Sequence, residues 1–312
     1  SSSSAASDVY KRQVRDILDK DQDIEALESM PSLPLPESIR AIIRGRINKF
    51  DETARHILLC AAILGHNFSP DLLKAVSNLE KFENIDYIEP LVKSGFISLT
   101  DEENSPELTF QLTHEKIRDV ILAESTPSSL RILHKRAADY MVEANHHPEQ
   151  AGVIANHYLA SGDRLNAFHW FIKAAQYAWT LGAKDDVLHN YLSAEKIYRD
   201  ASEGFFSIDD VLSLYEPWSN FAHQSNQTGL LEQIGLKIQF LGERENSPRL
   251  LGYAYIALAN SCHLRMEFDT GGNLLEKAID YLHLTNDRKA LASAILRKCS
   301  FQWWQLDFEG CR

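Results

Sequence analysis

Apolar residues recur at helical spacing through the first third of the chain. One run opens at Leu35-Pro36-Glu37, with the proline and the acidic residue where a helix start accepts them, and continues with isoleucines to Ile47. A second run begins at Asp51 and ends at Gly65, residue types that cap the two ends of helices. Further runs start at Ser69-Pro70 and around Ile85, the latter ending at Gly95. The pattern therefore predicts four helices between residues 35 and 95.

After Gly95 the period changes from helical to alternating. Polar and apolar residues alternate over residues 96–100 and again over 108–113, as in half-buried strands. The link between them, residues 101–106, consists of acidic residues, Asn, Ser and Pro, which are typical of a turn. Helices followed by a β-hairpin give the order of elements of a winged helix, with the hairpin as its wing.

The charge of this region argues against DNA binding. A winged helix that reads DNA needs a basic helix and usually a basic wing. Here the wing tip is acidic, and acidic residues outnumber basic ones in the last helix before it (Glu80, Glu83, Asp86 and Glu89 against Lys81 and Lys93). The 312-residue chain has a net charge of −12, which opposes attraction to phosphate backbones. We expect no nucleic-acid partner through this region.

Two of these segments resemble the region that follows the nucleotide-binding domain in bacterial STAND-type AAA+ ATPases. They are LPESIRAIIRGRI, residues 35–47, and ARHILLCAAILGHNF, residues 54–68. Two later segments, FQLTHEKIRD over residues 110–119 and LHKRAA over 133–138, are similar to that family's strand-to-helix histidine motif and to the helix after it. The resemblance covers nearly all of residues 32–200. Such proteins occur in signalling chains beside adenylate-cyclase, kinase or LuxR-type transcription-factor domains.

The resemblance implies a role for His114. In the family, a histidine at the end of this wing strand reaches the phosphates of the bound nucleotide and helps to hold the closed, ADP-bound state. Imidazole suits this role because it donates hydrogen bonds to phosphate oxygens. Acidic Glu115 follows the histidine where many members have a small or apolar residue, although other branches have Asp. The alternative is that His114 only caps or packs at the start of a helix over residues 115–123.

From residue 146 onward the pattern is helix after helix with short links. Small and large apolar residues fall at tetratricopeptide-repeat spacing in two places. These are Ile154, Ala155, Tyr158, Ala167, Phe171 and Ala174, and then Tyr255, Leu258, Ala259, Cys262, Gly271, Leu275 and Ala278. Phe268 and Phe308 recur 40 residues apart, more than the usual repeat of about 34, and this spacing resembles the elongated repeats of the maltose-regulon activator type. We expect a stacked solenoid whose function lies on a surface.

The expected fold class is mainly α, with a winged-helix domain that contains one β-hairpin followed by a tetratricopeptide-like α-solenoid. We expect the helical segment and winged helix over residues 14–145, and the solenoid, truncated at its C-terminus, over residues 146–312. Residues 1–13 show no apolar periodicity and no initiating Met, so we expect them to be a non-native leader.

The sequence contains no phosphate-binding loop of the form GxxxxGK[ST]. The acidic pairs Asp185-Asp186 and Asp209-Asp210 lie at predicted helix starts and not at the end of an apolar strand. We therefore expect no enzymatic activity and no cofactor in this fragment. The resemblance implies ATP or ADP in a full-length parent, whose nucleotide-binding domain would precede this region in the same chain.

The remaining residues with reactive or ligating side chains show little pattern. The cysteines Cys60, Cys262, Cys299 and Cys311 lack metal-site spacing and predict buried free thiols, and His56 beside Cys60 on one helix predicts packing. The histidines are dispersed along the chain (among them His134, His146, His147, His157, His169, His189 and His223) and predict no metal site. Most of the tryptophans are expected in the core, where they would not serve as anchors for a partner.

No stretch approaches the roughly 18 to 20 apolar residues of a membrane span, and no secretory signal is present. We expect a cytoplasmic chain without a membrane partner. The expected function is that of the regulatory and sensor fragment of a STAND ATPase: the winged helix restrains the nucleotide-bound state, and the solenoid binds a protein, a peptide or a small effector. The alternatives are a stand-alone tetratricopeptide-type adaptor and a DNA-binding winged-helix regulator.

Overall fold

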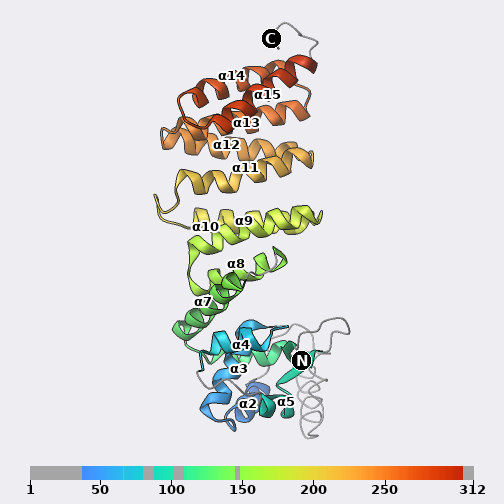
Figure 1. The fold of residues 1–312 in the computed structure, drawn as a ribbon, viewed down its shortest axis with the longest axis vertical. Helices are drawn as coiled ribbons and strands as arrows, with labels where there is room; N and C mark the ends of the chain where they lie inside the picture. The colour runs from blue at the N-terminus through green and yellow to red at the C-terminus, as the bar shows by residue number, and fades with distance from the viewer. Residues whose placement is uncertain (1–36, 66, 80–87, 101–108, 145–147, 305–312) are drawn as a thin grey trace, which may run out of the picture. The chain divides into compact units, whose positions relative to one another are not determined.

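The computed structural model describes residues 37–65, 67–79, 88–100, 109–144 and 148–304. The chain divides into two compact units between Ala167 and Phe168, and each is described by itself. The described residues are mainly α-helical, as predicted (Figure 1). The predicted domain boundary between residues 145 and 146 lies outside the described residues, as does the expected leader, residues 1–13.

The first unit contains short helices, one hairpin and a longer helix pair. Its elements in chain order are α2 (Glu37–Ile47), α3 (Glu52–Leu64), α4 (Pro70–Ser77), α5 (Glu89–Lys93), β1 (Ile97–Thr100), β2 (Thr109–Leu112), α6 (Glu115–Ala123), α7 (Pro127–Glu143), a 3₁₀ turn (Pro148–Gln150) and α8 (Ala151–Ser161). Helix α9 (Arg164–Thr180) runs across the division between the units. This order is the one predicted for a winged helix, although Leu35, Ile85 and the wing tip lie outside the described residues.

Local chemistry sets the ends of the first helices. The Asp51 carboxylate accepts a hydrogen bond from the backbone N–H of Ala54 at 2.7 Å and begins α3. Gly65 ends that helix with a φ of 80°, a conformation that favours glycine. Ser69 caps α4 in the same way as Asp51, with Pro70 in the first turn. The predicted boundaries of these helices are therefore confirmed to within a residue or two.

The hairpin pairs β1 with β2 in antiparallel register, with Ile97 opposite Leu112 and Thr100 opposite Thr109. Phe68, which precedes α4, adds a bridge to the outer side of β2 through two backbone hydrogen bonds with Phe110, at 2.8 and 2.9 Å. The sheet therefore ties the α3–α4 connection to the hairpin. The core of this unit gathers on the inner faces of these elements, with Ile57, Phe68, Phe96 and Phe110 almost fully buried.

The second unit is a stack of helices: α10 (Lys184–Arg199), α11 (Ile208–Gln224), α12 (Thr228–Arg244), α13 (Pro248–Leu264), α14 (Phe268–His283) and α15 (Arg288–Trp304). From α12 to α15 each helix begins 20 residues after the one before it. A pair of helices therefore repeats every 40 residues, the interval expected from the spacing of Phe268 and Phe308, although Phe308 itself lies outside the described residues.

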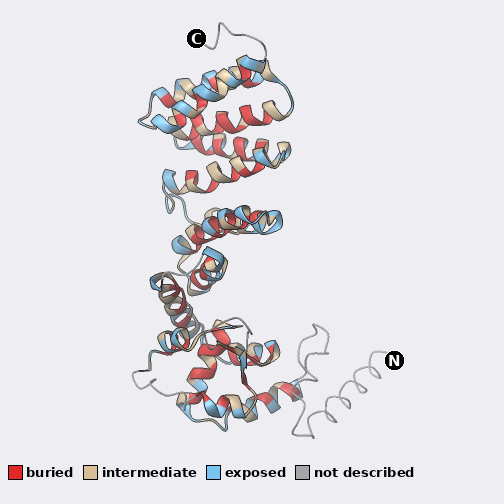
Figure 2. Ribbon diagram, turned by 45° about the vertical axis from the view of Figure 1, so that its right-hand side comes forward, coloured by how far each residue is buried: buried red, intermediate tan, exposed pale blue. Residues whose placement is uncertain are grey.

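Each helix of this stack contacts its neighbours in sequence. Helix α13 packs against α12 and α14 and also contacts α11 and α15, which gives the two layers of a helical repeat array. Buried residues line the faces between the helices and exposed ones the outer faces (Figure 2). The predicted small positions are at these contacts: Gly271 lies so close to Phe301 that a Cβ atom would come within 2.2 Å of its ring.

Candidate functional site

His114 lies at the junction between strand β2 and helix α6. Its backbone is extended, and its carbonyl oxygen accepts the N–H of Ile117 at 3.1 Å, so it is the N-cap residue of α6. Its side chain makes no capping hydrogen bond, yet it is only 9% exposed. His114 therefore caps α6 through its backbone and not through its imidazole, and packing at the helix start remains the alternative to a nucleotide contact.

The backbone before His114 is held firmly. Thr113 donates its N–H to the carbonyl of Phe96 at 3.1 Å and its hydroxyl to the carbonyl of Gly95 at 2.7 Å. One turn into α6, the Arg118 guanidinium donates to the carbonyl of Ala62 in α3 at 2.8 Å. The end of β2 is thus bonded to the residues just before β1, and the start of α6 is bonded to α3.

Near Arg118 the structure brings together two histidines that the sequence had presented as scattered. His134 on α7 and His157 on α8 place their Nδ1 atoms 2.9 Å apart. Burial, with Arg118 as a lesser cause, lowers the pKa of His134 to about 4. Burial, followed by His134 and Arg118, does the same to the pKa of His157. At neutral pH the two rings are therefore uncharged, and one donates its N–H to the other.

Cys60 and His56 on α3 do not form a reactive pair. The cysteine sulfur lies 3.8 Å from Nε2 of His56, but that nitrogen is 3.0 Å from the carbonyl oxygen of Ser77. A carbonyl only accepts, so Nε2 carries the proton and is not free to act as a base. Burial raises the pKa of the Cys60 thiol to about 12. The predicted packing role is confirmed, as is the prediction that Cys60 and Cys262 are buried free thiols.

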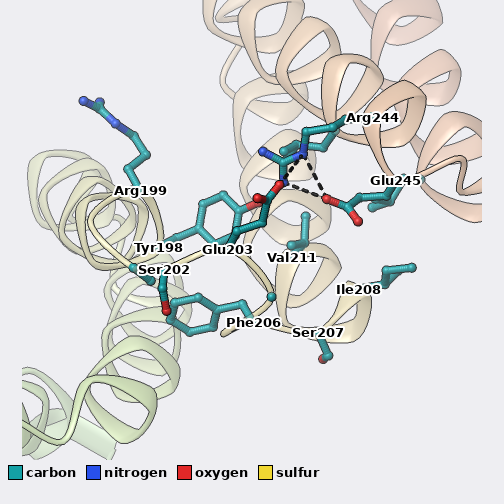
Figure 3. A pocket seen from close by; sticks show the side chains of 14 residues that line it. Tyr198, Arg199, Ser202, Glu203, Phe206, Ser207, Ile208, Val211, Arg244 and Glu245 are labelled. Carbon is teal, nitrogen blue, oxygen red and sulfur yellow. Dashed lines mark hydrogen bonds and ion pairs between the residues drawn. The ribbon is translucent and has the colours of Figure 1, made fainter.

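The second unit contains a cavity of about 460 Å³ beside the connection between α10 and α11 (Figure 3). Tyr198 and Phe206 form one wall, with apolar side chains of α11 and α12 such as Val211 and Leu241 around them. Arg244 at the end of α12 lies between Glu203, at 3.9 Å, and Glu245, at 2.8 Å. With Arg199, the lining carries two basic and two acidic side chains, so its formal charges balance.

The sequence predicts a binding surface and no cavity. One feature of the sequence, the length of a single connection between helices, nevertheless indicates this cavity. The connection between α10 and α11 runs from residue 200 to 207, whereas α11, α12 and α13 are followed by connections of only three residues. This longer connection interrupts the 20-residue spacing of the helix starts. It leaves a space between α10 and α11 that closely packed helices would fill.

The other predicted residues are distributed as follows. Asp185, Asp186, Asp209 and Asp210 lie in the first turns of α10 and α11, as predicted. Trp170 and Trp218 are buried, while Trp303 is 62% exposed. Among the described residues, no three His, Cys, Asp or Glu side chains converge as metal ligands, and His146 and His147 lie outside them. None of the described helices combines the length and the apolar character that a bilayer crossing needs.

No family model and no curated protein matches the sequence. Among solved structures, the chain is similar to a STAND protein with a tetratricopeptide repeat sensor from Pyrococcus horikoshii. The two share 10% sequence identity with a TM-score of 0.41, over 91% of this chain and 46% of the other. The chain thus spans less than half the length of that protein. A likeness this distant does not assign a family.

Proposed function

We propose that this chain is the regulatory and sensor region of a STAND-type ATPase of the bacterial signalling kind. The first unit is a winged helix that restrains the ADP-bound state through His114. The second unit is a tetratricopeptide-like solenoid that binds an effector or partner protein. Binding of ATP and ADP belongs to a nucleotide-binding domain that precedes this region in the parent, and the parent acts in the cytoplasm.

The observation that carries the proposal is the setting of His114. The histidine stands at the end of the second strand of the hairpin, at the junction that the family motif describes, and its side chain is not used to cap α6. Thr113 and Arg118 anchor the chain on either side of it. In the proposed restraint the imidazole would donate a hydrogen bond to a phosphate oxygen of the nucleotide.

The effector would act by changing an equilibrium. If it binds the solenoid more tightly in the open state, it weakens the restraint on ADP and ATP can replace it. The helical repeats suit such a role because they present long surfaces built from short units.

The test uses the full-length protein that carries this chain. Replacing His114 with Ala should speed the release of a fluorescent ADP analogue about tenfold, the cost of one hydrogen bond to a charged group. His189→Ala, an exposed histidine of α10, is the matched control and should leave the release rate unchanged. Equal rates for wild type and His114→Ala, or an upstream reading frame without a phosphate-binding loop, would contradict the proposal and favour the adaptor.

A further inference from the structure

Arg297 in α15 is a partly buried cation without a carboxylate partner among the described residues. Its Nη1 donates to Oδ1 of Asn260 on α13 at 2.6 Å, and its Nε lies 3.5 Å from the Ser293 hydroxyl. Burial lowers the pKa of Arg297, and no nearby acid offsets this. Removing a guanidinium from water without a counter-ion is unfavourable.

Two other arginines of the same stack each bind two carboxylates. Arg249 on α13 binds the carboxylates of Asp209 and Asp287. Arg265, just after α13, binds those of Glu232 and Glu267. The chain carries 44 acidic residues, yet none of the carboxylates in the described part of the chain pairs with this partly buried guanidinium.

Two histidines complete the group. His223 on α11 and His263 on α13 approach to 3.4 Å between Nε2 and Nδ1. Burial, then Arg297, then His263 lower the pKa of His223, so Arg297 is close enough to act on it. Asn260 is 2% exposed and fixes the guanidinium from beneath. We call His223, Asn260, His263 and Arg297 the Arg297 cluster; it spans three neighbouring helices of one layer.

We infer that the Arg297 cluster binds the carboxylate of a small organic anion, with Arg297 as the charged donor and the flanking imidazoles as further hydrogen-bonding groups. The planar guanidinium offers paired N–H donors that match a carboxylate. The Asn260 side chain accepts a hydrogen bond only from Nη1 of Arg297. The N–H groups on Nη2 of Arg297 can therefore donate to a carboxylate. Arg297 supplies a permanent positive charge, which the carboxylate of a monoanion would balance.

The rings beside the cluster indicate what the rest of the ligand resembles. The Phe301 ring lies 5.5 Å from that of His263, and Phe268 packs against both. Phe301 is only 3% exposed, so an aromatic or apolar body attached to the carboxylate would contact the partly exposed ring of Phe268. The inference deepens the proposed sensor role and rests on it for its biological meaning, but binding itself needs no nucleotide-binding domain, so the two proposals can fail separately.

The first experiment measures the binding of sodium benzoate to the 312-residue chain at pH 7.5 by calorimetry, with benzamide as its neutral counterpart. Wild type should bind benzoate saturably and benzamide far more weakly. Arg297→Gln keeps an amide donor for Asn260 but removes the charge, and should weaken benzoate binding about tenfold or more. Arg249→Gln is the matched control, because that arginine already has its carboxylates, and should bind benzoate as wild type does.

Several results would overturn the inference: no binding of benzoate to wild type, equal binding by Arg297→Gln, or an equal loss in Arg249→Gln. The same measurement is made with inorganic phosphate. If the chain binds phosphate more tightly than benzoate, a carboxylate is not the preferred ligand group. Should Arg297→Gln fail to fold, Arg297→Lys keeps the charge without the planar fork and should still lose several-fold in benzoate affinity; unchanged affinity would contradict the inference.

A second readout follows the His223 ring by NMR. A bound carboxylate offsets the charge of Arg297, so benzoate should raise the pH at which His223 titrates. Arg297→Gln should raise it in the free protein, and added benzoate should then shift it little. A His223 titration that benzoate does not move in wild type would show that the anion binds elsewhere.

Discussion

At the scale of single residues, the contact between His134 and His157 makes the stability of the first unit depend on pH. Each ring has an ordinary pKa near 6.5 in an unfolded chain, and in the folded chain each pKa is lowered to about 4. Between these values the unfolded chain binds protons that the folded chain does not. The contribution of the pair is therefore fully present above pH 6.5 and is lost as the pH falls through 4.

We expect each ring to lower the free energy of unfolding by up to about 3 kcal/mol between pH 7 and pH 4, with the smaller share from His134, which is more exposed to solvent screening than His157. His157→Gln keeps a polar partner for His134 and removes one titrating ring, so its urea unfolding midpoint should vary less with pH than that of wild type. His189→Gln, at an exposed position, should retain the wild-type dependence. A His157→Gln profile parallel to that of wild type would show that other groups cause the acid sensitivity.

The same pair marks the limit of what the sequence could predict at this scale. Cys60 beside His56 was correctly interpreted because both lie on one helix and four residues apart, where geometry follows from the helix itself. His134 and His157 are 23 residues apart on different helices, and their contact depends on how α7 packs on α8. Arg297 and Asn260 were missed for the same reason.

At the scale of elements, the helix boundaries could be predicted because their causes are local. Asp51, Gly65 and Ser69 act on the backbone within a few residues of themselves, so the residue type alone carries the signal. Small residues at helix contacts, such as Gly271, also indicate the stacking of the solenoid in the sequence. The cavity beside residues 200–207 could not be located, because a long connection in the sequence does not show which side chains it leaves apart.

Gly271 and Gly272 on α14 form a matched pair for testing the close packing of helices. A Cβ atom at Gly271 would lie 2.2 Å from the Phe301 ring, whereas at Gly272 it would meet nothing within 4 Å. Gly271→Ala should lower the free energy of unfolding by roughly 1–3 kcal/mol through overpacking. Gly272→Ala should raise it by roughly 0.5–1 kcal/mol through helix propensity. Urea unfolding followed by tryptophan fluorescence measures both, and changes of the same sign would contradict this packing.

At the scale of the whole molecule, stability is expected to be local. The core of the first unit runs from Ile39 to Ala137, and a separate cluster joins α13, α14 and α15. In a helical array each element is stabilised mainly by its neighbours, so opening one part need not open the rest. Local stability would suit the proposed sensor role, because a ligand could then reorganise the repeats without unfolding the first unit.

Hydrogen exchange followed by mass spectrometry tests this with Gly271→Ala. The crowded contact with Phe301 should speed amide exchange most in α14 and α15, next in α13, and progressively less towards α11. The effect should decrease in this order because each helix is stabilised mainly by the helices that it contacts. Peptides from α3, α4 and α6 should exchange at the wild-type rate, since their core shares no residue with the α13–α15 cluster. Gly272→Ala, with no crowding, should leave exchange in all of these peptides unchanged or slower. Uniformly faster exchange along the chain in Gly271→Ala would instead mean that the two units unfold as one, and would contradict local stability.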